Sequence, residues 1–551
     1  MTSYVSPASL RAGGPHRFTR QVERLLGQLG FQSIANIDGS GDKGGDLLAE
    51  LHGQLWVFQA KWKSRGPVDS SGVDEVADAQ DHYGADRAVV VTNSHPSAAA
   101  EQRAHELRRL GRLIDFWRGT DLSQLLSAAP EHPALTLRDY QDEAVAALWA
   151  DLHERQRALL ILATGLGKTV VGGEVIGRYV RENPDRDVLV VAHTKDLVNQ
   201  LERALWRHLP KRVGTQVLTG DEKPADLTGL TCATVASALT AVLKGWKPGL
   251  VMVDETHHVA EDGQFHRLLT ELGDSLQFGV TATPWRGDRY DIEQRFGSAS
   301  YKLGIEAGMR RGYLAAVDYR LFVDNIDWSA VRDASEHDYS VKELNSRLFL
   351  PQRDEAVVDA LIDAWHTTSA PRGIVFCQTI EHCERMQELL RRLPEWRRAS
   401  TIHTEMALRE RQQRLLDFRA GRVPILIAVD ILNEGVDVPD VNILAFARVT
   451  HSRRVFVQQL GRGLRLRAGK EKVLALDFVS DIRRVAALLD MRRQLEREEI
   501  EILPHVPQPS IAFNDVRAES LLEQWILDAA DLETANDEAR LQFLDPDVLP
   551  T

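Results

Sequence analysis

The sequence predicts an α/β protein in which three α/β domains follow one another and lead into a short, acidic helical tail. Two observations predict this class. Short apolar runs of strand length alternate with segments of helical periodicity over most of the 551 residues. A glycine-rich loop also follows the apolar run 159–162 and precedes a helix-compatible stretch, 170–180, which is the strand, loop and helix order of a phosphate-binding loop.

Composition shifts divide the chain into five segments. Pro130 and Pro133 mark the first linker, and prolines between residues 504 and 509 mark a later connector. The predicted segments are an N-terminal domain at 1–128, a linker at 129–136, two lobes at 137–312 and 313–498, and a connector with the acidic tail at 499–551. Within them we expect helices at 18–29, 97–110 and 170–180, and strands at 55–60, 88–91, 250–253, 373–376, 423–429 and 473–478.

Composition narrows the class of protein. The 43% hydrophobic and 27% charged fractions are typical of globular domains. We find no apolar run near the roughly 18 residues that a membrane span needs, so we expect a cytoplasmic protein without membrane contact. The three cysteines, Cys232, Cys377 and Cys383, lack a paired zinc spacing, and we expect buried, reduced thiols.

The formal net charge of −13 does not exclude a nucleic-acid partner. From Asp515 onward there are ten acidic and two basic side chains, so over half of the excess lies in the tail. A basic groove in the near-neutral remainder is therefore compatible with the composition. The tail itself is open to three interpretations: it binds a protein partner, it masks that groove, or it keeps the protein in solution.

The loop after residue 162 carries the groups that bind a nucleoside triphosphate. Lys168 supplies a positive charge at the β and γ phosphates, and the Thr169 hydroxyl can ligate Mg²⁺. Glycines let the backbone amides wrap the phosphates, as at a helix N-terminus. The residues expected to cradle the phosphates are Thr164, Gly165, Leu166 and Gly167.

Two carboxylates complete the predicted nucleotide site. They follow the buried strand 250–253, roughly ninety residues after the phosphate loop. Asp254 would hold Mg²⁺ through water, and Glu255 would orient or deprotonate the attacking water.

Five motifs in a fixed order resemble those of superfamily 2 helicases, and they are most similar to the DEAD/DEAH-type motors of restriction enzymes. The motifs are Gln141, the loop 165–169, Asp254-Glu255-Thr256-His257, Thr281-Ala282-Thr283 and the segment 458–465. This resemblance covers roughly residues 135–494. It implies two RecA-like P-loop lobes, hydrolysis of ATP with Mg²⁺, and a nucleic-acid partner.

The resemblance also assigns roles in the first lobe. Gln141 would read the adenine edge with its amide, while Arg138 or Tyr140 stacks on the base, which implies a preference for ATP. Thr281 and Thr283 resemble the motif that links hydrolysis to the strand-binding face. The alternative for this segment is a plain turn before a proline.

In the second lobe, the resemblance places Arg462 and Arg465 at the γ-phosphate. An arginine there neutralises the charge that develops in the transition state, and so couples hydrolysis to lobe closure. Gly435 and Asp437, in a segment that matches the family's fifth motif, would meet the nucleotide or its ribose.

Loops on both lobes resemble the family's strand-binding motifs. Hydroxyls, amides and a lysine suit contacts to phosphates, which carry no sequence information. For each loop alone, a solvated turn is the other interpretation. The residues predicted to contact nucleic acid are His193, Thr194, Lys195, Thr234, Gln378 and Thr379.

The N-terminal domain contains a candidate metal-nuclease grouping. Asp46 precedes Gln59 by thirteen residues, which is the spacing of adjacent strands in a hairpin, and alternation puts Gln59 and Lys61 on one face. Asp46 and the Gln59 oxygen would hold Mg²⁺, and Lys61 would orient water or steady the phosphate. The alternative is a glycine-rich turn beside an edge strand.

This segment resembles the Mrr-like branch of the restriction-endonuclease fold, which uses Gln in place of the commoner second acid. Glu23, in the predicted helix 18–29, is either a further metal-shell carboxylate or an ordinary charge on the helix surface.

The resemblances together imply an ATP-dependent DNA helicase or translocase fused to a Mg²⁺-dependent endonuclease that acts on duplex or forked DNA in restriction or antiphage defence. Two alternatives stay open. One is a DNA or RNA remodelling helicase whose N-terminal domain only binds duplex, and the other is a nucleotide-gated clamp that recruits a partner through the acidic tail.

Overall fold

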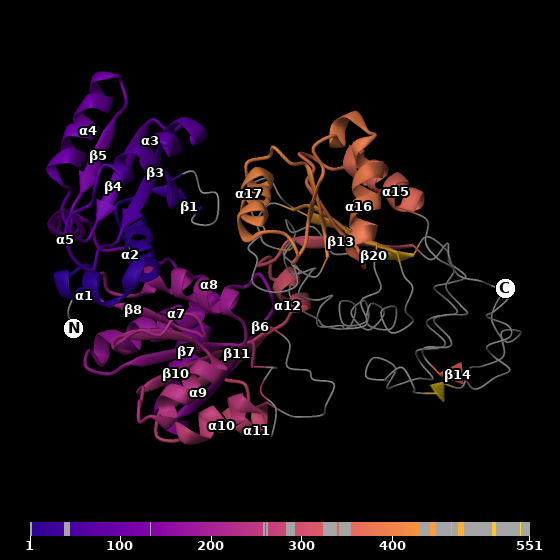
Figure 1. Ribbon diagram of the computed structural model, residues 1–551. Helices are drawn as coiled ribbons and strands as arrows, with labels where there is room; N and C mark the ends of the chain where they lie inside the picture. The colour runs from indigo at the N-terminus through magenta and orange to yellow at the C-terminus, as the bar shows by residue number, and fades with distance from the viewer. Residues whose placement is uncertain are drawn as a thin grey trace, which may run out of the picture. The chain divides into compact units, whose positions relative to one another are not determined.

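The computed structural model describes residues 3–37, 44–132, 134–256, 259, 263–282, 292–322, 339–340, 354–429, 441–447, 464, 472–478, 510–513 and 540–541. The chain separates into two compact units (Figure 1). The first comprises Met1–Leu160, Thr169–Thr281 and Tyr290–Tyr301, and the second comprises Ile161–Lys168, Ala282–Arg289 and Lys302–Thr551. We describe each unit by itself.

The N-terminal domain is a five-stranded sheet flanked by helices. The strands follow chain order: β1 (Gln32–Asn36), β2 (Leu47–Leu51), β3 (Gln54–Lys61), β4 (Arg87–Thr92) and β5 (Ile114–Trp117). The first three strands pair antiparallel and the last three parallel. Parallel neighbours need a long crossover, which α3 (Ser71–Tyr83) and α4 (Ala98–Arg109) provide. The remaining helices are α1 (Pro7–Ala12), α2 (Gly14–Gln28) and α5 (Gly119–Ala128).

Strand alternation gives this sheet two apolar faces. Phe58 of β3 packs with Phe18 of α2 and Leu122 of α5, whereas Val57 packs with Val73 and other residues of α3. Each face therefore has its own core, and every odd-numbered position near the end of β3 lies on the α3 side.

Lobe 1 contains a seven-stranded sheet. Its order is β12 (Tyr301–Leu303), β6 (Arg157–Leu162), β11 (Leu276–Thr281), β10 (Leu250–Asp254), β7 (Val188–Ala192), β9 (Leu230–Thr234) and β8 (Thr215–Leu218). The central strands β10 and β7 are buried along their whole length and are nearly continuous apolar runs, as is typical of a parallel sheet covered on both faces. Its helical elements are α6 (Asp139–Arg155), α7 (Lys168–Glu182), α8 (Lys195–Leu205), η1 (Trp206–His208), α9 (Val235–Leu243), α10 (Gln264–Glu271) and α11 (Glu293–Phe296).

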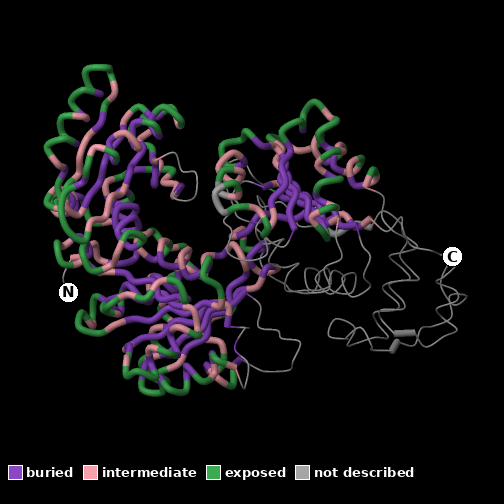
Figure 2. Tube along the Cα trace, viewed as in Figure 1, coloured by how far each residue is buried: buried purple, intermediate pink, exposed green. Residues whose placement is uncertain are grey.

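The second unit contains a second seven-stranded parallel sheet. Its order is β16 (Ser400–Ile402), β17 (Ile425–Ala428), β15 (Gly373–Phe376), β18 (Ile443–Phe446), β19 (Lys472–Phe478), β13 (Ala316–Phe322) and β20 (Ser510–Phe513). The unit also contains α12 (Ile305–Arg310), α15 (Asp354–Thr367), α16 (Ile380–Arg391), η3 (Pro394–Trp396), α17 (Leu408–Arg419) and the antiparallel pair β14 (Tyr339–Ser340) and β21 (Arg540–Leu541). Figure 2 shows the strands of both large sheets buried beneath more exposed helices and turns.

The predicted α/β class with parallel sheets is confirmed, and two predicted assignments differ. Residues 510–513, expected in a connector, form β20 at the edge of the second sheet, because their backbone pairs with β13. In the acidic tail, Arg540–Leu541 form β21, which pairs with β14, where a helix is predicted. The other residues after 513, and with them the proposed partner-binding surface, lie outside the described residues.

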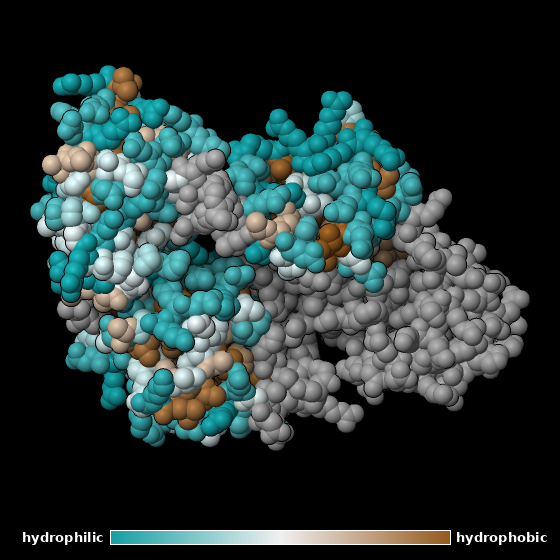
Figure 3. All heavy atoms as spheres, viewed as in Figure 1, coloured by the Kyte–Doolittle hydropathy of each residue, from teal (hydrophilic) through white to brown (hydrophobic). Residues whose placement is uncertain are grey.

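The cysteines and the surface agree with the sequence-based expectations where the structure describes them. Cys232, Cys377 and Cys383 are all free and buried, and burial raises the pKa of the Cys232 thiol well above its usual value. Figure 3 shows a mostly hydrophilic face over the described residues. None of the helices that are described has the length and hydropathy to cross a membrane.

Candidate nucleotide and nuclease sites

The phosphate loop joins β6 to α7 as predicted. Gly165 and Gly167 have φ angles of 92° and 88°, which only glycine adopts without strain. Lys168 is the first residue of α7, so the loop amides and the helix N-terminus point to the same region. The hydroxyl oxygen of Thr164 is buried and has no hydrogen-bond partner among the described residues. This geometry fits a bound phosphate chain.

The acidic pair, Asp254 and Glu255, lies at the end of β10, a strand of the same sheet as β6. β10 ends at Asp254, which is 8% exposed, and Glu255 turns the chain with a φ of 50°. β10 runs parallel to β11, and β6 starts at the same edge as β11, since Gln277 N donates to Gln156 O at 3.0 Å. The phosphate loop and the acidic pair therefore follow strands that end at one edge of one sheet.

Gly279 on β11 makes room for the residue after this pair. A β-carbon at Gly279 would lie 2.4 Å from Cγ2 of Thr256, which is fully buried. The acidic motif and the strand that leads to Thr281 are thus packed directly on each other. Any movement of one is transmitted to the other.

Gln141 occupies the N-terminus of α6. Its Oε1 accepts a hydrogen bond from Arg138 N at 3.0 Å, and its own N donates to Arg138 O at 2.8 Å, so the Gln141 side chain caps the start of the helix. The suggestion that Tyr140 stacks on the base is wrong, because that side chain is 1% exposed and lies in the core. Arg138 is exposed, and stacking of its guanidinium on the base stays a prediction.

Several predicted residues lie outside the described part of the chain. They are Thr283, Gly435, Asp437, Arg462 and Arg465. Between the two arginines, Leu464 is fully buried, and its carbonyl accepts a hydrogen bond from Ala315 N at 2.8 Å. This bond joins Leu464 to the residue that precedes β13.

The predicted strand-binding residues of lobe 1 share a sheet edge. β7 and β9 pair in parallel with Ala192 opposite Thr234, so His193, Thr194 and Lys195 follow at the same edge as Thr234. Thr194 caps α8, with its Oγ1 accepting from Leu197 N at 3.3 Å. The structure thus brings these four residues together.

In the second unit, Gln378 and Thr379 follow β15. Thr379 caps α16, and its Oγ1 accepts from His382 N at 3.1 Å. As in lobe 1, the predicted strand contact is a strand end followed by a helix N-terminus.

The nuclease residues meet on the α3 face of the N-terminal sheet. Asp46 is 6% exposed and Gln59 is 5% exposed. Asp46 N donates to Phe58 O at 2.8 Å, and Asp46 Oδ2 accepts from Ala60 N at 2.5 Å. Alternation from Val57 places Gln59 and Lys61 toward α3. The predicted hairpin is confirmed, and β3 is a central strand rather than an edge strand.

The amide oxygen of Gln59 provides a test of whether a metal fits here. Gln59 Oε1 is buried and has no hydrogen-bond partner among the described residues, which is costly for a polar atom. A divalent cation held by this oxygen and by Asp46 would satisfy it, and hard cations prefer oxygen ligands. The described residues contain no cluster of three or more His, Cys, Asp or Glu side chains that could hold a metal ion.

Sequence reasoning missed Glu75. Lys61 Nζ forms an ion pair with Glu75 Oε2 on the first half of α3. Gly44, with a φ of 84°, allows this approach, because a β-carbon there would lie 2.3 Å from Glu75 O. Glu75 follows Lys61 by fourteen residues and lies on the crossover helix α3. The sequence feature that could have indicated this partner is an acidic residue in the first turns of that helix.

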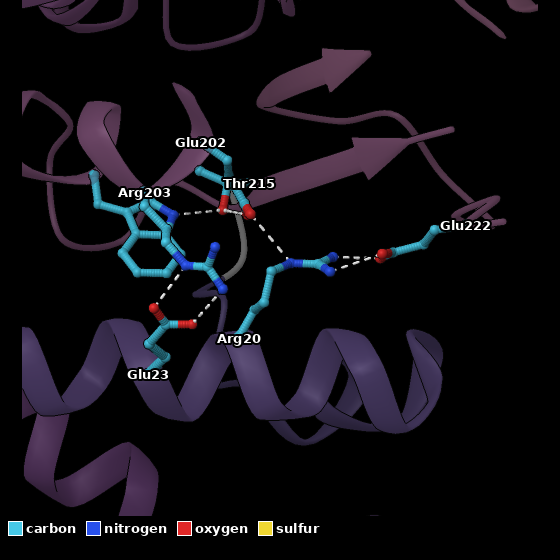
Figure 4. Close-up of polar contacts among 7 residues, drawn as sticks. Arg20, Glu23, Glu202, Arg203, Thr215 and Glu222 are labelled. Carbon is cyan, nitrogen blue, oxygen red and sulfur yellow. Dashed lines mark hydrogen bonds and ion pairs between the residues drawn. The ribbon is translucent and has the colours of Figure 1, made fainter. Parts of the chain in front are cut away.

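Glu23 is not brought to this grouping. Both its carboxylate oxygens accept hydrogen bonds from Arg203 of lobe 1, at 2.6 and 3.0 Å (Figure 4). Glu23 is only 6% exposed, so it is not an ordinary charge on the helix surface. Glu23 therefore serves the contact between the N-terminal domain and lobe 1.

Comparisons with known proteins agree with this geometry. Family models match in three places: "Restriction endonuclease", of the Mrr catalytic type, at residues 10–126, "Type III restriction enzyme, res subunit" at 134–286, and "Helicase conserved C-terminal domain" at 353–467. The chain thus carries two helicase domains and an Mrr-like restriction endonuclease domain. Domains of these kinds use a nucleotide and a divalent metal ion.

The similar proteins include both helicases and restriction-enzyme subunits. The chain is 29% identical to irc3 of Schizosaccharomyces pombe, by name a mitochondrial ATP-dependent helicase, over 69% of this chain and 64% of irc3. It is 23% identical to the type I restriction enzyme EcoKI endonuclease subunit of Escherichia coli, over 72% of this chain and 40% of that subunit. The chain thus spans less than two thirds of either relative.

A solved structure shares the fold. The ATP-dependent type ISP restriction-modification enzyme LlaBIII bound to DNA aligns with a TM-score of 0.53 and 16% identity, over 94% of this chain and 42% of that one. At this identity the similarity concerns the fold alone.

Proposed function

We propose that the chain hydrolyses ATP to move along DNA and cleaves DNA in a Mg²⁺-dependent reaction, in restriction or antiphage defence. The observation that carries the proposal is the Asp46, Gln59 and Lys61 grouping on one face of a buried sheet, where the Gln59 oxygen has no hydrogen-bond partner in the described part of the chain. A domain that only bound duplex would have no use for a buried amide oxygen without a partner.

The motor residues would act on the triphosphate and on the attacking water. Lys168 balances charge at the β and γ phosphates, and Thr169 and Asp254 hold the Mg²⁺ that accompanies the nucleotide. Glu255 positions the water, and Arg462 and Arg465 stabilise the charge that develops on the transferred phosphoryl group. Those two arginine roles rest on the sequence motif.

The nuclease residues would act on a phosphodiester. A Mg²⁺ ion held by Asp46 and Gln59 supplies Lewis-acid stabilisation of the phosphate and lowers the pKa of bound water. Lys61 adds a positive charge at the phosphate, and Glu75 sets the direction of the lysine side chain. DNA as the substrate is supported by the restriction enzymes among the relatives.

One experiment tests both activities. The purified protein is incubated with linear, circular and forked DNA, with and without ATP and with Mg²⁺ or EDTA, while phosphate release and strand cleavage are followed together. We expect DNA-stimulated phosphate release and Mg²⁺-dependent cleavage. DNA-stimulated release without cleavage in Mg²⁺ or Mn²⁺ would instead identify a remodelling helicase.

Replacing Glu75 with glutamine is expected to slow cleavage by about tenfold, the size of effect typical of residues that orient catalytic groups. The ion pair with Lys61 is partly exposed, at 24% and 41% of the two side chains, so its contribution to stability is at most about 1 kcal/mol. Cleavage kinetics and the melting temperature are measured for this variant and for Glu106→Gln, which alters an exposed carboxylate on α4. Equal cleavage rates in the two variants would rule out the positioning role.

A further inference from the structure

Helix α2 of the nuclease domain is bound to lobe 1 by buried ion pairs. Arg20 Nη1 donates to Glu222 Oε2 at 2.7 Å, and Arg20 Nε lies 3.1 Å from Glu202 Oε2. Three residues along the helix, Glu23 pairs with Arg203 (Figure 4). In one pair α2 supplies the positive side chain and lobe 1 the negative ones, and in the other pair the charges are reversed. Both pairs form only when α2 lies in one register and one direction on lobe 1.

Three of these side chains are almost fully removed from water, while their partners Glu222 and Arg203 are 20% and 35% exposed. The side chain of Glu202 is 2% exposed, that of Glu23 is 8% exposed and that of Arg20 is 10% exposed. Glu202 also accepts from Thr215 Oγ1 at 2.6 Å. Desolvated charges are tolerated only when every partner is in place, so loss of one partner disfavours the whole contact strongly.

Glu202 and Arg203 both lie on α8 of lobe 1, and this helix begins at a predicted DNA contact. Lys195 is the first residue of α8, and its Nζ lies 2.5 Å from Asp221 Oδ2. Asp221 immediately precedes Glu222, in a turn closed by two bonds with Thr219, from Thr219 N to Glu222 O at 2.9 Å and from Glu222 N to Thr219 Oγ1 at 3.2 Å. One turn therefore holds the partner of Lys195 and the partner of Arg20.

We propose that this turn couples DNA binding at lobe 1 to docking of the nuclease domain. The inference rests on the proposed function, in which Lys195 contacts a DNA phosphate. A phosphate that takes Lys195 releases Asp221, the turn loses one contact with α8, and Glu222 is held less firmly against Arg20. The nuclease domain then loosens from lobe 1 when a strand is bound.

The exposures of the charged groups support this direction. Lys195 and Asp221 are 52% and 76% exposed, so their pair is weak and a phosphate can replace the aspartate. The Arg20 contacts are buried and sensitive to small displacements. Exchange of Asp221 for a phosphate at Lys195 can therefore shift the Arg20–Glu222 contact on the same turn.

The docking contact is tested first, without DNA, in the full chain. The reporter is the rate at which a Glu-specific protease cuts after Glu131 in the linker. This linker is held on lobe 1, since Lys211 Nζ donates to Ala129 O at 2.8 Å. Glu222→Gln and Glu23→Gln should each raise the rate by about tenfold or more, while Glu106→Gln should leave it unchanged. Equal rates in all four proteins would overturn the docking claim.

The coupling is tested with a single-stranded oligonucleotide of about 30 thymidines and no ATP, with binding followed by fluorescence anisotropy. In the wild type, bound DNA should raise the rate of cutting after Glu131. Asp221→Asn should show the raised rate before DNA is added and little further change. Binding with no change in the wild-type rate would overturn the coupling alone. Absence of any binding would overturn the coupling and the proposed function, while leaving the docking result in place.

Discussion

Replacing Lys168 with alanine is expected to lower DNA-stimulated ATP hydrolysis by roughly 10²- to 10³-fold, as removal of a group that stabilises transition-state charge does in other enzymes. Lys168 is the first residue of α7, after two glycines in the left-handed region. No backbone amide can replace its positive charge at the β and γ phosphates. The measurement is phosphate release under saturating DNA.

The matched control is Lys244→Ala, which removes an exposed lysine at the C-terminal end of α9. This protein should hydrolyse ATP at the wild-type rate. The nuclease domain has its own two cores, so the Lys168 variant should stay folded by circular dichroism. DNA-stimulated hydrolysis that persists in a folded Lys168→Ala protein would refute the motor assignment.

Replacing Asp46 with asparagine is expected to reduce Mg²⁺-dependent cleavage by about 10³-fold or more, because loss of the metal removes several kcal/mol of transition-state stabilisation. The asparagine oxygen can still accept the hydrogen bond from Ala60 N, so the hairpin should persist. Cleavage of supercoiled DNA and binding of Mn²⁺ by calorimetry are measured together. ATP hydrolysis should stay near the wild-type rate.

Two further variants sharpen this result. Lys61→Ala should lose cleavage but keep metal binding, since its charge acts on the phosphate and not on the cation. Glu106→Gln should behave as the wild type. Continued cutting by both Asp46→Asn and Lys61→Ala would place the nuclease elsewhere in the chain or show that there is none.

The strands and the nuclease face could be predicted because both depend on local patterns. Apolar runs bounded by turn residues became buried strands, as at β10 and β15. The shared face of Gln59 and Lys61 needed no more than the two-residue period of a strand. The register that places Leu47 opposite Phe58 brought Asp46 beside them.

What could not be predicted depends on how distant segments meet. Glu23 pairs with a residue 180 positions away, and no periodicity in α2 indicates that partner. Glu75 reaches Lys61 through the way α3 crosses the sheet, which a sequence pattern does not specify. Tyr140 was misplaced because a shift of one residue at the start of α6, a rotation of about 100°, decides whether a side chain faces the core or the solvent.

The position of β20 has a consequence for shortened forms of the protein. A chain cut after residue 498, where the helicase motifs have ended, would lack the strand that pairs with Asp318 to Leu321 of β13. The N–H and C=O groups on that side of β13 would then be open to pairing with another molecule, which is a common origin of self-association. Proteolytic fragments that end there are expected to form oligomers and aggregates, even though every motor motif is intact.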